Sequence, residues 1–297
     1  MAGPCPTGKN LGCSVEKKGI LVGNVEKYIL ERNNPIMFRA VLDYRNFIIS
    51  SVMGEFKSRF ARSRLGGIWM ILNPLAQVAI YAIVLSHLMS SRLQGVNYKY
   101  SYIIYLMAGT LAWSLFSEIV TRCLTVFIDN SNLLKKLIFP RICLPIIILG
   151  SSLVNNLLLF VSIVFISAIL GHWPNFSITF LPIMVILTSM LGIGLGIVLG
   201  VLNVFIRDIG QVIPILLQFG YWLTPIVYMP TIIPEHYRQW LAFNPLYPVV
   251  NSYHRILVFG IWPDFKNLLW VILLGFFLLG IGLFLFRKAS PEMVDVL

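Results

Sequence analysis

The stretch FLPIMVILTSMLGIGLGIVLGVLNVF fills residues 180–205 and contains no charged side chain. About 20 residues of helix cross the hydrocarbon core of a bilayer. No water is present there to satisfy exposed backbone groups, so a run of this kind must be helical. We therefore predict a transmembrane helix in this segment, long enough to tilt or to project beyond the hydrocarbon core.

Five other apolar runs flank this stretch and extend the same pattern. They cover residues 68–88, 102–121, 142–170, 212–228 and 268–286. The whole chain is 58% hydrophobic and 12% charged, with a mean hydropathy of +0.82, whereas soluble domains carry roughly 25% charged residues. The sequence thus predicts an all-α membrane protein with six transmembrane helices and excludes a soluble domain.

The basic residues are distributed unequally between the two sides of this topology. Seventeen Lys and Arg residues fall on the side of the N-terminus, the 128–141 loop, the 204–210 connection and the C-terminal tail, against five on the other side. By the positive-inside rule both termini lie in the cytoplasm of a multi-pass protein in a bacterial inner membrane. The net charge of +11 comes in blocks between apolar runs. Topology and lipid headgroups explain such blocks, so we expect no nucleic-acid partner.

The chain divides by composition into four segments. Residues 1–36 form a polar extension whose role stays open, residues 37–66 an amphipathic cytosolic helix, residues 67–290 the transmembrane domain, and residues 291–297 a cytosolic tail. In the second segment apolar and basic side chains alternate at helical spacing, which favours a helix at the membrane surface over one packed on protein alone. Its basic residues are Arg45, Lys57, Arg59, Arg62 and Arg64.

Motifs of nucleotide or metal chemistry are absent from the sequence. There is no phosphate-binding GxxxxGK[ST] loop, no zinc-protease or serine-hydrolase signature, and no Cys/His cluster. We predict free thiols at Cys5, Cys13, Cys123 and Cys143, no metal or cofactor in this chain, and no enzymatic activity. Any ATP hydrolysis must then belong to another chain.

Two features inside the predicted spans admit more than one interpretation. Glu118 is the only acid well inside a span, and Arg122 lies one turn away, so a structural pair is favoured over an ion-coupling site. Gly192, Gly196 and Gly200 form a smooth stripe that lets another helix approach closely. The stripe serves either packing within one protomer or a dimer interface.

Two connecting segments carry their own signals. Residues 130–141 read NSNLLKKLIFPR, which predicts a short amphipathic helix that rests on the membrane or inserts into a groove on a partner. Residues 229–266 are too polar to span but rich in Trp, Tyr and Phe, which predicts two short helices at the outer interface. They form either an aromatic belt or a lid over a pathway.

At this point the sequence resembles the ABC-2 type permeases of the polysaccharide export family. The run FKSRFARSRLGGIWMILNPL at residues 56–75 has their order of basic serine-containing segment, Leu-Gly, Trp and Pro. Three further motifs follow in order: NVFIRDIGQ at 203–211, LTPIVY at 223–228 and NPLYPVV at 244–250. The resemblance covers about residues 40–290 and finds no counterpart for residues 1–36.

The resemblance implies a membrane subunit that moves a lipid-linked, O-antigen-like polysaccharide across the inner membrane. It implies a homodimer with two copies of a cytosolic ABC ATPase, which binds ATP and Mg. Residues near 44–64 and 130–141 would transmit the ATPase motion, with Arg207 and Asp208 assisting. The implied coupling residues are Asn130, Leu133, Leu134, Lys135, Lys136, Arg141, Arg207 and Asp208.

The same resemblance assigns roles to the aromatic residues. The outward segment 229–262 would form gate helices with Trp240, Phe243, Tyr247 and Tyr253. Aromatic planes stack on the apolar C–H faces of sugars, so aromatics in the spans are candidates for lining the translocation path. These candidates are Trp69, Tyr81, Trp113, Phe116, Tyr221, Trp222 and Tyr228.

Two alternative functions remain open from the sequence. One is an ABC-2 exporter of a drug or small lipid, against which the basic helix and the LGGIWMILNP run argue. The other is a membrane-embedded glycosyltransferase or polymerase, which needs paired acids for base catalysis or metal binding. The loops offer only the scattered acids Asp129, Asp208, Glu235 and Asp264.

Overall fold

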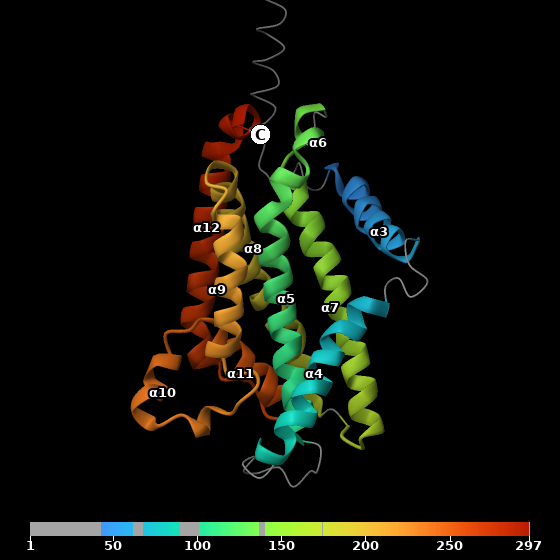
Figure 1. Ribbon diagram of the computed structural model, residues 1–297, viewed down its shortest axis with the longest axis vertical. Helices are drawn as coiled ribbons and strands as arrows, with labels where there is room; N and C mark the ends of the chain where they lie inside the picture. Colours follow the sequence, from blue (N-terminus) through green and yellow to red (C-terminus); the bar gives the residue numbers. More distant parts are fainter. Residues whose placement is uncertain (1–42, 62–67, 90–100, 137–139, 174, 297) are drawn as a thin grey trace, which may run out of the picture.

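The computed structural model describes residues 43–61, 68–89, 101–136, 140–173 and 175–296, which comprise helices and their connections without a strand. The predicted all-α class is therefore confirmed for these ranges. The long helices α5, α7, α8, α9 and α12 run along the long axis of the molecule, and α4 is inclined to them (Figure 1). Their bounds are α4 Ile68–Met89, α5 Ser101–Asp129, α7 Cys143–Ile169, α8 Leu181–Phe205, α9 Ile209–Leu223 and α12 Phe265–Val296.

Four helices in the described ranges are long and apolar enough to cross a membrane. They are α5, α7, α12, and α8 together with the short 3-10 helix η2 (Phe176–Phe180) that precedes it. Helix α9 and part of α4 are apolar but shorter. The expected multi-pass arrangement is thus confirmed in this coarser form, and the count of six spans stays a prediction.

Helices α5 and α8 form the centre of the molecule and meet through glycines. A Cβ at Gly196 would lie 2.7 Å from the Cβ of Cys123, and one at Gly200 would lie 2.4 Å from the backbone oxygen of Cys123. Gly192 of α8 likewise faces Ile119 of α5. Of the two interpretations of the glycine stripe, packing within one protomer is the one that the structure shows.

The fifth apolar run was expected to continue to residue 228, but α9 ends at Leu223. Thr224 is extended (φ −91°, ψ 131°), as a residue that precedes proline prefers to be. The backbone carbonyls freed after the helix are satisfied by α5. Tyr102 donates to the carbonyl of Val227 at 2.7 Å, and Tyr105 donates to that of Pro225 at 3.1 Å.

The last helix is longer than the apolar run predicts. The run ends near residue 286, whereas α12 continues to Val296 and passes through Pro291. The extension buries Met293 in a cluster that includes Phe286 and also Leu134 of the short helix α6 (Ser131–Lys136). Packing of an apolar side chain beyond the bilayer run therefore keeps this segment helical.

A helix is present in the predicted segment as α3 (Arg45–Ala61), and its place at the membrane surface stays a prediction. It lies beside α7, away from α8 and α12 (Figure 1), and Gly150 of α7 admits Val52 of α3. Ile49 and Met53 of α3 are exposed. The remaining parts of this prediction lie outside the described residues, namely residues 37–42, residues 62–66 with Arg62 and Arg64, and the side chain of Arg59, as does the 1–36 extension.

The place of segment 229–266 at the outer interface stays a prediction, but the segment contains two short helices, as the sequence predicts. They are α10 (Glu235–Leu241) and α11 (Leu246–Leu257), and both lie toward the end of the molecule opposite to α6 (Figure 1). The 3-10 turn η3 (Pro230–Ile232) precedes them. Helix α11 packs against α5 and α8, so it is part of the core.

Candidate translocation cavity and coupling elements

A cavity of about 360 Å³ opens between α4, α5 and α9. Its volume falls within the usual range of small-ligand sites, about 300–1,000 Å³. Helix α4 contributes two side chains, and α5 and α9 contribute five each. The lining residues are Pro74, Gln77, Thr110, Trp113, Ser114, Ser117, Thr121, Pro214, Leu217, Gln218, Tyr221 and Trp222.

Three of the predicted path aromatics meet in the wall of this cavity. Trp113 of α5 and Tyr221 of α9 make an edge contact with ring centroids 5.6 Å apart. Tyr221 makes a second edge contact with Trp222 at 5.9 Å. Aromatic faces and edges are thus presented from two helices to one space.

The other predicted path aromatics lie elsewhere. Phe116 is 6% exposed and packs in the core beside Trp113. Tyr228 donates to the carbonyl of Trp222 at 3.0 Å, and Trp69 is exposed near the start of α4. The side chain of Tyr81 lies outside the described residues.

A row of hydroxyl side chains on α5 forms a second part of the lining, which we did not predict. Thr110, Ser114, Ser117 and Thr121 follow at spacings of four, three and four, so they share one helix face. Ser114 donates to the carbonyl of Leu111, and Ser117 donates to that of Trp113. The helical spacing of these hydroxyl residues is visible in the sequence. Isolated Ser and Thr residues within an apolar run do not by themselves indicate a binding surface.

The predicted coupling residues gather at the end of the molecule that carries α6 and the C-terminus (Figure 1). Leu134 is buried, and Asn130 donates back to the carbonyl of Val126. Arg207 and Asp208 are exposed in the connection from α8 to α9. The side chains of Leu133, Lys135 and Lys136 lie outside the described residues.

Arg141 connects this end to the C-terminal helix. Its guanidinium donates to the hydroxyl of Ser290 at 2.8 Å and also contacts the backbone oxygen of Ser290. Partial burial lowers the pKa of the Arg141 guanidinium. The contact fixes the entry of α7 against α12, which contains the predicted tail.

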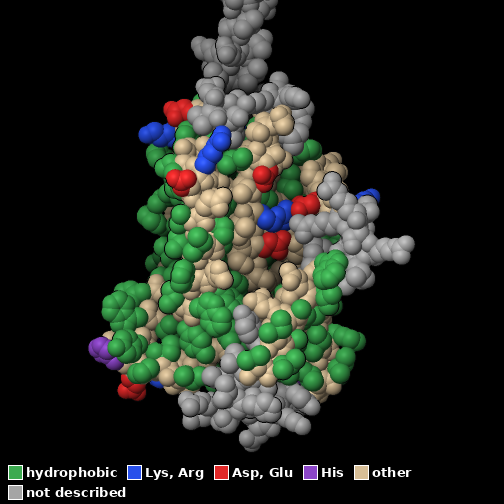
Figure 2. Space-filling view, in the orientation of Figure 1, with side chains coloured by type: hydrophobic (Ala, Val, Ile, Leu, Met, Phe, Trp, Pro, Cys, Tyr) green, Lys and Arg blue, Asp and Glu red, His purple; other side chains and the backbone are tan. Residues whose placement is uncertain are grey.

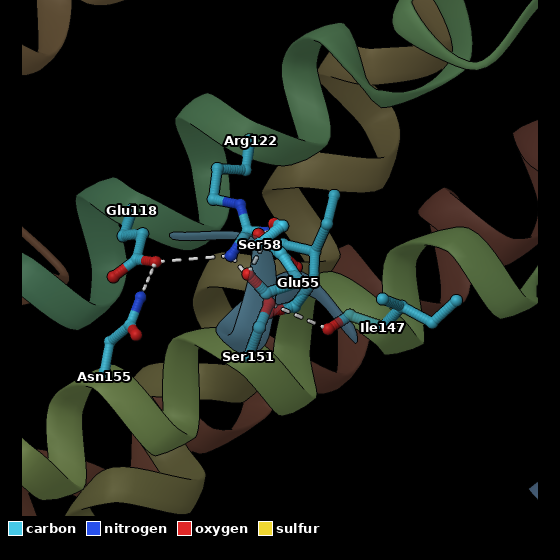
Figure 3. Close-up of polar contacts among 8 residues, drawn as sticks. Glu55, Ser58, Glu118, Arg122, Ile147, Ser151 and Asn155 are labelled. Carbon is cyan, nitrogen blue, oxygen red and sulfur yellow. Dashed lines mark hydrogen bonds and ion pairs between the residues drawn. The ribbon is translucent and has the colours of Figure 1, made fainter. Parts of the chain in front are cut away.

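A polar cluster around Arg122 joins three helices (Figure 3). The predicted pair is confirmed, with Arg122 donating to Glu118 at 3.3 Å. Arg122 also donates to Glu55 of α3 at 2.5 Å and to Ser151 of α7 at 2.7 Å. Asn155 of α7 donates to Glu118 at 2.6 Å. We call these five residues the Arg122 cluster.

The predicted gate residues fall into two environments. Trp240 and Phe243 are 70% and 81% exposed, so large apolar surfaces face outward here. Tyr247 is partly buried, and this burial raises the pKa of its hydroxyl. Tyr253 is fully buried, with its hydroxyl 3.4 Å from that of Thr188 on α8.

Beside Tyr253, a histidine that the sequence did not single out packs into the core. The ring of His254 stacks on Tyr105 with centroids 3.6 Å apart and lies against Gly109. Tyr253 and His254 therefore hold α11 on α8 and α5.

Charge is unevenly spread over the surface. Figure 2 shows most Lys, Arg, Asp and Glu side chains of that face toward the end with α6, and a few near α10. No group of three or more His, Cys, Asp or Glu side chains suited to a metal ion occurs in the part of the chain that the structure describes. Cys123 and Cys143 are buried free thiols.

Comparison with known proteins gives a consistent set of relatives. Residues 47–258 match the model of the ABC-2 type transporter family. The O-antigen export system permease protein RfbA of Myxococcus xanthus is 26% identical over 87% of this chain and 98% of its own length. RfbA of Klebsiella pneumoniae is 29% identical over 82% and 92%. The polysialic acid transport protein KpsM of Escherichia coli is 27% identical over 81% and 92%.

Proposed function

This chain belongs to the ABC-2 type transporter family, and from that premise we propose that it is the membrane subunit of an ATP-driven exporter of a lipid-linked, O-antigen-like polysaccharide. The predicted family is confirmed, and a transport subunit of this family is not an enzyme. The observation that carries the proposal is the cavity between α4, α5 and α9, where aromatic, hydroxyl and amide side chains meet. A site that binds sugars requires this combination, because aromatic rings stack on the apolar C–H faces and polar side chains form hydrogen bonds with the hydroxyl groups.

A separate ATPase subunit supplies the energy in this proposal and binds ATP and Mg. Two elements support a docking role at the end with α6. Helix α6 is anchored to α12 through Leu134, and the 206–208 connection exposes Arg207 and Asp208 at the same end of the molecule (Figure 1). The Arg122 cluster gives α3 a direct polar connection to α5. Motion imposed on α3 or α6 would reach the helices that line the cavity.

The assembly in this proposal is a homodimer with two ATPase copies and with both termini in the cytoplasm of a bacterial inner-membrane protein. The distribution of basic residues supports that orientation. A second copy packed over its opening would close the cavity between α4, α5 and α9, which is partly open to its surroundings. The outward helices α10 and α11 would then form the gate, with exposed Trp240 and Phe243 at its rim.

Two measurements in the native bacterium test the function. We would tag the chain, purify it in mild detergent and identify the ATPase that copurifies, then delete the gene and label polymer on intact and on opened cells. The proposal expects a stable ATPase complex and polymer that is retained inside the deletion strain. Normal surface polymer with no ATPase partner would refute it, and loss of drug resistance with normal surface polymer would favour the small-molecule exporter.

A further inference from the structure

We propose that the cavity between α4, α5 and α9 takes a neutral, hydroxyl-rich glycan segment and disfavours segments that carry carboxylates or phosphates. This inference rests on the proposed function, since it specifies the chemical class of polymer that passes. It concerns the lining side chains of α4, α5 and α9.

The first argument is the absence of counter-charge. None of the described residues that line the cavity is Lys, Arg, His, Asp or Glu. An ionised group moved out of water without a partner costs far more than a hydroxyl that finds a hydrogen bond. A copy related by two-fold symmetry would add the same uncharged lining from its own helices.

The second argument is the direction of the hydrogen bonds. Ser114 donates its proton to the carbonyl of Leu111 at 3.1 Å, and Ser117 donates to that of Trp113 at 2.8 Å. Each hydroxyl oxygen then faces the cavity with acceptor lone pairs. A sugar hydroxyl can donate to such an oxygen, whereas a carboxylate or phosphate oxygen is itself an acceptor and depends on the uncharged donors of the lining, such as the amides of Gln77 and Gln218.

The cation that directly follows the lining of α5 in the sequence does not compensate for this lack of charge. Arg122 follows Thr121 directly, but its guanidinium donates to Glu55, Glu118 and Ser151 on the side of α3 and α7. Two carboxylates thus already balance its single charge. An acidic glycan that recruited Arg122 would have to break this cluster.

The aromatic wall completes the preference for uncharged rings. Trp113, Tyr221 and Trp222 offer apolar surface for the C–H faces of a sugar, and a π-face repels an anion. The relatives by name include both O-antigen and polysialic acid transport proteins. Polysialic acid carries a carboxylate on each sugar, so sequence similarity alone does not choose between neutral and acidic cargo, whereas this lining does.

The test compares two oligosaccharides of equal length on the purified permease–ATPase complex. Maltoheptaose is the neutral probe and heptagalacturonate, at pH 7, is the acidic probe. Binding is followed by saturation-transfer difference NMR. We expect maltoheptaose to bind at least about tenfold more tightly, because the acidic probe must bury charge without a partner. Trp113→Ala should weaken maltoheptaose binding, which locates the signal in the cavity.

A charge introduced into the lining gives the sharper result. Gln218→Lys places a cation in the cavity and should raise heptagalacturonate affinity severalfold while leaving maltoheptaose affinity little changed. Gln211→Lys makes the same substitution on α9 at an exposed position outside the lining, and should change neither affinity.

Three outcomes would overturn the inference: equal binding of both probes by the unmodified complex, tighter binding of the acidic probe, or no binding of either. None of them decides the proposed function, because export of the native polymer is measured separately in the deletion strain. Equal binding together with retained polymer in that strain would leave an exporter whose cavity does not select by charge.

Discussion

Glu55 of α3 and Arg122 of α5 form an ion pair at 2.5 Å, although 67 residues separate them in the sequence. The two side chains are 26% and 23% exposed, so the pair contributes only about 0–1 kcal/mol to stability. The pair matters more for the way it connects helices than for its contribution to stability. One guanidinium holds the surface helix, the central helix and, through Ser151, helix α7 (Figure 3).

Glu55→Gln should therefore reduce coupling more than stability. The substitution keeps the shape of the side chain and removes the charge that Arg122 meets across the helix boundary. We expect less polymer exported per ATP hydrolysed by the complex, with a change in the free energy of unfolding below about 1 kcal/mol. Export from intact cells and ATPase activity of the purified complex measure the ratio.

Glu235→Gln is the matched control, because it is the same isosteric change at an exposed position of α10. A double-mutant cycle with Arg122→Gln adds a second check, since paired residues give non-additive effects. Additive losses, or an unchanged export-to-ATP ratio in Glu55→Gln, would contradict the coupling role of this pair.

The Arg122 cluster also shows what a sequence can and cannot predict. Glu118 and Arg122 were paired correctly because they lie one turn apart on a predicted helix. Glu55 and Asn155 escaped prediction because their contacts depend on how α3 and α7 pack against α5, which hydropathy does not encode. The presence of the long helices could be predicted from the length of the apolar runs alone, because the backbone of a segment inside the bilayer must form its hydrogen bonds within that segment.

The boundaries that failed have local physical causes. Helix α9 ends before Pro225 because proline disfavours a helical residue in front of it, and the sequence contained that signal. Helix α12 continues past its apolar run because Met293 packs in the same buried cluster as Leu134 of α6, a tertiary arrangement that an average of hydropathy along the sequence does not detect. The cavity was anticipated only through three of its aromatics, whereas its shape depends on the separation of three helices.

Gly200→Ala should destabilise the protein by disturbing the contact between α5 and α8. The added Cβ would lie 2.4 Å from the backbone oxygen of Cys123, and backbone cannot rotate away as a side chain can. Overpacking of this kind costs about 1–3 kcal/mol. Thermal unfolding in detergent, followed by size-exclusion profile, measures the loss. Gly280→Ala on α12 meets nothing within 4 Å and should leave the melting temperature unchanged, so an equal fall in both variants would reject the packing argument.

Charge reversal on α6 should impair ATPase coupling while leaving membrane insertion intact. The change is Lys135→Glu with Lys136→Glu, in a helix that Leu134 anchors to α12. We expect weaker recovery of the ATPase on purification and reduced export. Labelling of single cysteines placed on either side of the membrane verifies the topology. Lys266→Glu, exposed at the opposite end, is the control for a charge change alone, and normal export by the α6 variant would count against a coupling role.

Trp113→Ala should reduce export by removing the aromatic surface that α5 gives to the cavity. The ring centroids of Trp113 and Tyr221 are 5.6 Å apart, so the loss of Trp113 also removes the contact that holds the Tyr221 ring of α9 in the cavity wall. Trp113→Phe keeps an aromatic face and should retain part of the export rate, measured as labelled polymer reaching the surface per unit time. Trp270→Ala on the exposed side of α12 removes the same ring away from the cavity and should have no effect. If Trp113→Ala and Trp270→Ala export equally well, the wall formed by Trp113 and Tyr221 does not contact the polymer, and the path must run elsewhere between the helices.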